Sequence, residues 1–179
     1  YTIARHLETF DYLCGRLVGH VDRCVFSFVE IYKKLRYNMP ELIPLTEEDM
    51  DELAAGLGRI AAAHGMRIQT CGTNGDWSRY GINPSGCMTL EMLGAANGIE
   101  FRKLKHKGTR AGCHCIESRD IGAYDSCPNG CHYCYANKDA RKALENYRTQ
   151  HDPESPLLLG HLRDGDEVVQ GSQRTFLAK

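Results

Sequence analysis

The sequence predicts an α/β protein: part of a TIM-like barrel of βα units, followed by a cysteine-rich cluster-binding loop and a helix. Two observations predict the βα units: helical patterns alternate with short apolar strand patterns, and the connections between them are short. A third predicts the second part, since five of the nine cysteines fall between positions 113 and 134. We therefore expect a βα-repeat portion over residues 1–108 and a cysteine-rich portion over residues 109–179.

The first element is an amphipathic helix that starts at the beginning of the sequence. Its apolar side chains recur at helical spacing on one face, namely Ile3, Leu7, Phe10, Cys14, Leu17 and Val18. No capping residue lies far enough upstream to begin this helix, and the sequence does not start with Met. We therefore expect that an N-terminal part of the protein precedes it.

Two apolar runs, residues 24–29 and 66–71, are typical of strands buried in a parallel sheet. Between them Thr46 is placed to cap a helix whose first turn carries three acidic side chains, which favour the positive end of the helix dipole. Gly65 is expected to end this helix. The order helix, strand, helix, strand is that of βα units.

The second half is less regular. Glycine and asparagine punctuate a loop after residue 71, and a short helix is expected near residues 89–96. A helical pattern starts again near Tyr133 and extends to Tyr147. The end of the chain is expected to form a closing strand or a tail.

Composition excludes several classes of protein. With 42% hydrophobic and 25% charged residues, the chain can build a core and is not a disordered tail. Nine cysteines are too few, and odd in number, for a disulfide scaffold. A net charge of -1 argues against partners recruited by bulk charge. With no membrane-length apolar stretch and no secretion signal, we expect a cytoplasmic setting, no membrane partner, and cysteines that bind metal or act in redox chemistry.

The strongest chemical signal is the run Cys127-Pro-Asn-Gly-Cys131-His-Tyr-Cys134, called the cysteine loop below. Gly130 permits a positive φ and Pro128 stiffens the entry, so three thiolates can face one ligand. A helix starting near Tyr133 would direct its positive end at a bound, negatively charged cluster. Three thiolate ligands at the positive end of a helix suit a [4Fe-4S] cluster with one iron left open, because clusters held by four thiolates have other cysteine spacings in the sequence.

Four further cysteines, Cys71, Cys87, Cys113 and Cys115, form a candidate second site, called the thiol quartet below. Cys71 ends a predicted strand and Cys87 lies in the following loop, so both can meet the Cys113–Cys115 pair at the mouth of a barrel. Four thiolates would hold an auxiliary cluster or a structural zinc. The alternative is that Cys71 and Cys87 are packed thiols.

Structural zinc is also the alternative for the cysteine loop, since its spacing overlaps that of zinc knuckles. The ligands available to complete such a site are Cys113, Cys115, His114 and His132. The remaining thiols, Cys14 and Cys24, lie on apolar faces and are assigned to packing.

With Tyr133 just before its last cysteine, the cysteine loop resembles that of radical S-adenosylmethionine enzymes. The resemblance implies that Cys127, Cys131 and Cys134 hold a [4Fe-4S] cluster and that Tyr133 lies at the cofactor. It also implies that the open iron binds S-adenosylmethionine, which an electron from the cluster cleaves to a carbon radical, and that a flavodoxin or ferredoxin supplies electrons. Such enzymes usually carry this loop after the first barrel strand, with a Gly-Gly-Glu-like segment downstream; here the loop is late and that segment is absent.

The segment from Cys113 to Asn137 is similar to the domain-of-unknown-function-1848 family, bacterial proteins that join a βα-barrel-like domain to this motif. The similarity continues in the segments Val25–Phe28, Tyr32–Lys34, Thr70–Cys71, Gly86–Cys87 and Ser155–Gly160. It implies that this chain is the C-terminal part of a longer protein. It indicates the class of cofactor and leaves the substrate and the catalytic residues open.

The sequence thus predicts an iron-sulfur protein of the radical S-adenosylmethionine type, acting on a small-molecule or macromolecular substrate. One alternative is a structural zinc-binding domain. Another is a DNA-repair lyase that uses the same cluster and contacts phosphate through a basic run over residues 102–110. Such runs are more often solvated faces than binding sites. The basic residues of this run are Arg102, Lys103, Lys105, His106, Lys107 and Arg110.

Overall fold

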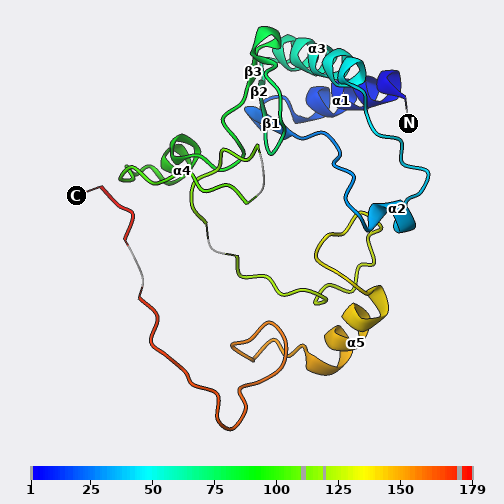
Figure 1. The fold of residues 1–179 in the computed structure, drawn as a ribbon. Coiled ribbons are helices and arrows are strands. Elements are labelled where there is room, and N and C mark those ends of the chain that lie inside the picture. The colour runs from blue at the N-terminus through cyan, green and yellow to red at the C-terminus, as the bar shows by residue number, and fades with distance from the viewer. Residues whose placement is uncertain (1, 110–111, 119, 173–174, 179) are drawn as a thin grey trace. The chain divides into compact units, whose positions relative to one another are not determined.

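The computed structural model describes residues 2–109, 112–118, 120–172 and 175–178 (Figure 1). Within them lie five α-helices, a 3-10 helix and a three-stranded sheet. In chain order the elements are α1 (Ile3–Leu17), β1 (Arg23–Phe26), α2 (Leu35–Asn38), α3 (Glu47–Ala63), β2 (Arg67–Thr70), η1 (Ser78–Tyr80), β3 (Ile82–Asn83), α4 (Leu90–Asn97) and α5 (Ala140–Gln150). None of the helices in the described part of the chain has the length and apolar character needed to cross a membrane.

The chain forms two compact units, called the first and the second unit below. The first contains Tyr1–Glu30, Pro44–Ser118 and Thr175–Lys179, and the second contains Ile31–Ile43 and Arg119–Arg174. The thiol quartet therefore belongs to the first unit and the cysteine loop to the second.

The sheet of the first unit is parallel throughout, in the order β1-β2-β3. Cys24 pairs with Ile68, and Ile68 pairs in turn with Ile82. The predicted α/β class and both predicted strands are confirmed, while β3 falls in a segment expected to be loop. No closed barrel is formed by the described residues.

The sequence-encoded cap of α3 is present. Thr46 Oγ1 accepts a hydrogen bond from the Asp49 backbone N–H at 3.1 Å, and Asp49 Oδ2 accepts from the Thr46 N–H at 3.0 Å. This reciprocal pair satisfies two N–H groups that the helix cannot satisfy itself. Past the other end of α3, Gly65 takes a φ of 66°, as expected for a residue that terminates a helix.

The expectation that α1 has no cap was wrong. Thr2 Oγ1 accepts a hydrogen bond from the Arg5 N–H at 3.2 Å, which is the usual N-cap arrangement. α1 packs against α3 (Figure 1), and Gly56 allows the close approach, because a Cβ there would lie 2.6 Å from the Leu7 side chain.

The core of the first unit lies between these helices and the sheet. Cys14 is buried in it, and Cys24 packs against it, in agreement with their assignment to packing. The buried members of the core are Cys14, Ala54, Ala61, Met66, Ile68, Trp77 and Ile82. All of them precede residue 83, so the described residues of 84–118 contribute no member to this core.

In the second unit, α5 begins later than predicted, at Ala140 and not near Tyr133. Asp139 caps it, with Oδ1 accepting from the backbone N–H groups of Arg141 at 2.8 Å and Lys142 at 3.2 Å. Just upstream, the buried Asp125 accepts hydrogen bonds from the Lys138 and Asp139 N–H groups. In a helix that started near Tyr133, the Lys138 and Asp139 N–H groups would donate to backbone carbonyls of the preceding turn. Here they donate to Asp125 instead, and residues 131–138 form turns and bends.

The end of the chain, predicted to be a closing strand or a tail, forms one isolated bridge, between Leu177 and Phe101. Two backbone hydrogen bonds flank it, from Arg102 N–H to Phe176 O at 2.9 Å and from Ala178 N–H to Glu100 O at 3.0 Å. Between α5 and this bridge, the described residues form no helix or strand.

Candidate metal centre

The structure brings three thiols of the quartet together. The sulfur atoms of Cys71, Cys113 and Cys115 all lie within 4.8 Å of one another, with Cys71 Sγ 3.9 Å from Cys115 Sγ. The fourth thiol is adjacent, because Cys87 Sγ lies 3.4 Å from Cys115 Sγ. Thiols in this arrangement can hold a metal ion or a cluster.

Cys71 is positioned by the sheet. It follows the last residue of β2, and its backbone N–H donates to Phe26 O at 3.0 Å, which extends the β1-β2 ladder by one step. A thiol directly after a parallel strand lies at the carboxyl edge of the sheet, where α/β proteins commonly place functional groups.

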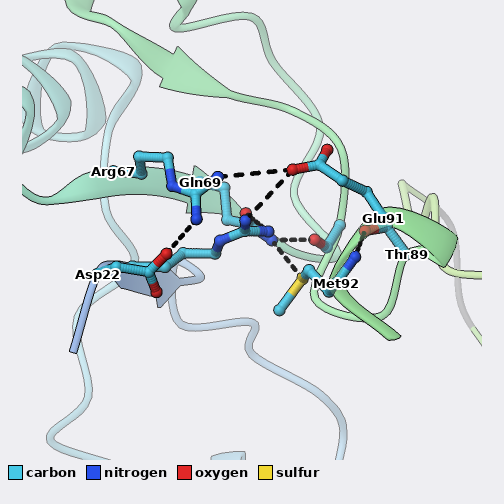
Figure 2. A network of polar contacts seen from close by, with 8 residues as sticks. Asp22, Arg67, Gln69, Thr89, Glu91 and Met92 are labelled. Atoms are coloured by element: carbon cyan, nitrogen blue, oxygen red, sulfur yellow. Dashed lines mark hydrogen bonds and ion pairs between the residues drawn. The ribbon is translucent and has the colours of Figure 1, made fainter. Parts of the chain in front are cut away.

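Cys87 is positioned through a buried glutamine on β2. Gln69 Nε2 donates to the carbonyl of Gly86 and approaches Met92 Sδ at 3.7 Å, while Gln69 Oε1 accepts from Arg23 Nη1 at 3.2 Å (Figure 2). This amide ties the loop before Cys87 to the sheet. Sequence reasoning missed Gln69, although a polar residue within an otherwise buried strand was a usable signal.

The outer part of the same network carries charge. Arg67 forms an ion pair with Asp22 and a second one with Glu91 at 3.5 Å, so β2 is linked to the first turn of α4 (Figure 2). Thr89 Oγ1 caps α4 by accepting from the Met92 N–H at 3.2 Å. These contacts fix the segment on the C-terminal side of Cys87.

Cys113 and Cys115 belong to a short antiparallel pairing centred on the bridge between His106 and Ile116. Lys107 N–H donates to Cys115 O, and Glu117 N–H donates to Lys105 O, both at 3.1 Å. A third bond, from Ile116 N–H to Met88 O at 3.1 Å, joins this pairing to the segment that carries Cys87. The two cysteine-bearing segments are therefore held together by backbone contacts.

Two glycines allow these segments to approach closely. Gly86 has a φ of 86°, and a Cβ on it would lie 3.3 Å from Cys115 Sγ. At Gly108 a Cβ would lie 2.3 Å from the Cys113 carbonyl oxygen and 2.6 Å from its Cβ. Only a residue without a side chain fits these positions unless the cysteines move.

The thiols influence one another's protonation. A hydrogen bond from the Cys115 backbone N–H, assisted by one from Thr109, lowers the pKa of Cys113 to about 7. A hydrogen bond with Cys71, together with burial and a contact with Cys115, raises the pKa of Cys87 to about 12. Burial raises the pKa of Cys115. Metal binding to this group would therefore displace protons from the thiols that hold them most tightly.

The cysteine loop, in the second unit, has a more open arrangement. Cys127 and Cys131 are exposed, Cys134 is half-buried, and all three are free thiols. Among the described residues, the three sulfurs of this loop do not all lie within 4.8 Å of one another, as those of Cys71, Cys113 and Cys115 do. Gly130 has a φ of 65°, as its place in the loop predicted.

Side chains outside the loop hold its backbone. Lys34 Nζ donates to the Cys134 carbonyl at 3.3 Å and to that of Asn137. Asn137 Nδ2 donates to Cys127 O at 2.6 Å, and the Asn137 backbone N–H donates to Cys134 Sγ at 3.4 Å. Lys34 and Asn137 were not among the predicted site residues, because nothing in the local sequence shows that they meet this loop.

A pocket of about 460 Å³ borders the loop at Cys131. Beside Cys131, the polar side chains of its lining are those of Lys34, Asn38, His132, Asn137, Lys138 and Asp139. Near it, the rings of Tyr32 and Tyr133 pack edge to face with centroids 5.7 Å apart. The predicted cofactor residue Tyr133 thus contacts an aromatic neighbour in the same unit.

The basic run has local partners in the first unit. Lys107 Nζ lies 3.8 Å from Glu117 Oε1, and the Arg102 guanidinium lies over the Phe176 ring at 5.6 Å. Arg110 lies outside the described residues. A nucleic-acid partner for this run stays a prediction.

No curated protein and no solved structure matches this chain. Residues 1–136 match the family described as Domain of unknown function (DUF1848). The match covers most of the chain and includes every cysteine of the quartet and of the loop. With these residues matched, the chain belongs to the DUF1848 family.

Proposed function

We propose that this chain is an iron-sulfur protein of the radical S-adenosylmethionine type, in which Cys127, Cys131 and Cys134 hold a [4Fe-4S] cluster. One observation carries the proposal: the side chains of Lys34 and Asn137 hold the backbone of the cysteine loop, while its three cysteines form no disulfide. A loop fixed in this way presents its ligands without ordering many residues at the moment of binding.

The surroundings of the loop fit a negatively charged cluster. The Lys34 ammonium lies against the loop, and the Asn137 N–H donates to Cys134 Sγ. Positive charge and N–H donors to sulfur stabilise thiolates and tune the potential of such clusters.

The sulfur spacing also supports a cluster over a single ion at this loop. A four-iron cluster places each thiolate on a different iron, so its ligands lie farther apart than the four ligands of one tetrahedral ion. The loop sulfurs are spread more widely than the three of the quartet that lie within 4.8 Å of one another.

In this proposal the cluster supplies one-electron reduction of the cofactor, with a flavodoxin or ferredoxin as the electron source. The chain's own part is to bind and orient. Lys34 and Lys138 line the pocket beside Cys131 and provide positive charge for a carboxylate such as that of S-adenosylmethionine. Tyr133 is proposed to shield the cluster from water on the side where it packs against Tyr32.

Anaerobic purification, followed by iron, sulfide and zinc analysis and EPR of the reduced protein, tests this proposal. We expect the cluster signal to change on addition of S-adenosylmethionine. Substitution of all three loop cysteines by alanine should remove iron and sulfide, whereas the control Cys24→Ala, which removes a thiol outside both groups, should not. Zinc without sulfide would overturn the cluster, and a signal indifferent to S-adenosylmethionine would overturn the radical mechanism.

A further inference from the structure

We propose that the thiol quartet is a separate metal centre that binds one tetrahedral Zn²⁺, with Cys87 as the fourth ligand. The inference rests on the first unit alone and does not depend on the proposed function of the cysteine loop.

Two sulfur distances of the quartet are close to those expected around a single ion. With a Zn–S bond of about 2.3 Å and tetrahedral angles, neighbouring ligand sulfurs lie about 3.8 Å apart. The Cys71–Cys115 and Cys87–Cys115 distances, 3.9 and 3.4 Å, lie on either side of that value. Cys113 has its sulfur within 4.8 Å of both Cys71 and Cys115. The sulfur of the exposed Cys87 does not lie within 4.8 Å of all three, so this side chain would have to turn toward the ion to complete the tetrahedron.

The close approach of the segments that carry these thiols argues against an iron-sulfur cluster here. Any cluster of two or more irons divides four thiolates between metal atoms and separates some of them well beyond one tetrahedral edge. The segments that carry these thiols are in contact at Gly86, where a methyl group would be tight, and at Gly108, where there is no room for one. Inserting a cluster would require contacts fixed by the sheet and by backbone hydrogen bonds to open.

The first unit also has a structural need for such a link. Among the residues that the structure describes, its core contains none beyond Ile82, and α4 has no buried residue. Cys115 and Ile116 are the buried apolar residues in the described part of residues 84–118. A segment with so little apolar burial is held poorly by packing, and a structural zinc would supply the missing folding free energy.

The quartet joins segments far apart in the sequence, at residues 71, 87 and 113–115. With all four positions taken by protein thiols, the ion has no open site for a substrate, so its role is structural rather than catalytic. The zinc would fasten the irregular segment to the carboxyl edge of the sheet.

The test is zinc analysis of the protein in which Cys127, Cys131 and Cys134 are all replaced by alanine. We expect about one zinc per chain, retained in a further Cys24→Ala control and reduced at least about tenfold by Cys87→Ser. Retention of one zinc in the Cys87→Ser variant, or iron with sulfide in place of zinc, would overturn the inference.

Since Cys87→Ser could act by unfolding the chain, a second measurement avoids mutating the quartet. The protein lacking the loop thiols is loaded with Co²⁺, whose visible absorption reports both tetrahedral geometry and the number of thiolate ligands. Intense bands typical of four thiolates are expected, and an octahedral spectrum would contradict the site. If iron is absent from the wild type while these bands are present, the proposed function fails and the zinc site stands.

Discussion

Gly108→Ala should weaken zinc binding without removing any ligand. The new Cβ would lie 2.3 Å from the Cys113 carbonyl oxygen and 2.6 Å from the Cys113 Cβ. Ordinary carbon contacts need about 3.5 Å, so the segment carrying Cys113 must move by about 1 Å. Ligand distances in metal sites hold to about ±0.2 Å, so a displacement of this size cannot be absorbed by the metal–sulfur bonds.

Loss of support around a metal ligand typically costs about 10- to 100-fold in affinity, and we expect at least that range for Gly108→Ala. Competition with a chromophoric chelator measures the zinc affinity directly. The matched control is Gly171→Ala, because a Cβ at Gly171 meets no atom within 4 Å. Equal zinc affinity in the Gly108 variant, the control and the wild type would refute the placement of Cys113 against residue 108 in a zinc site.

Three further predictions concern other parts of the molecule. Lys34→Met removes the ammonium that holds the carbonyls of Cys134 and Asn137, so iron and sulfide content should fall while zinc is unchanged; unchanged iron would show that the loop does not need Lys34. Thr46→Ala should lower the free energy of unfolding by about 0.5–2 kcal/mol in urea titrations, because it removes the α3 cap, and no change in midpoint would contradict this. Zinc affinity should fall as pH falls, because Cys87, with a pKa raised to about 12, and Cys113, with a pKa lowered to about 7, bind the metal as thiolates. Calorimetry at several pH values should show that protons are released on binding. A zinc affinity that does not depend on pH would argue against thiolate ligands.

The parts of the fold that the sequence predicted are those with strong local signals. Thr46 and the acidic turn after it predict the start of α3, and the two apolar runs predict β1 and β2. β3 was missed because it has only two residues and depends on pairing with β2. The start of α5 was predicted too early because Asp125, which is distant in sequence, accepts hydrogen bonds from the Lys138 and Asp139 N–H groups just before the helix.

At the site too, some features have a local signal in the sequence and others depend on contacts between distant segments. Of the predicted cysteine groups, the structure brings together Cys71, Cys113 and Cys115, and the position of Cys71 at a strand end indicated where they meet. The supporting residues Gln69, Lys34 and Gly108 act through contacts with segments far along the chain or through close backbone approach. Such contacts leave no local pattern in the sequence, so only the three-dimensional structure could identify them.

The most direct test of the two-centre account is the metal and sulfide content of the wild-type protein beside that of the variant lacking all three loop cysteines, both purified anaerobically. The account predicts about one zinc with about four iron and four sulfide per wild-type chain, and zinc alone in the variant. Iron and sulfide that persist in the variant, or a wild-type protein with zinc bound at the loop and none at the quartet, would contradict it.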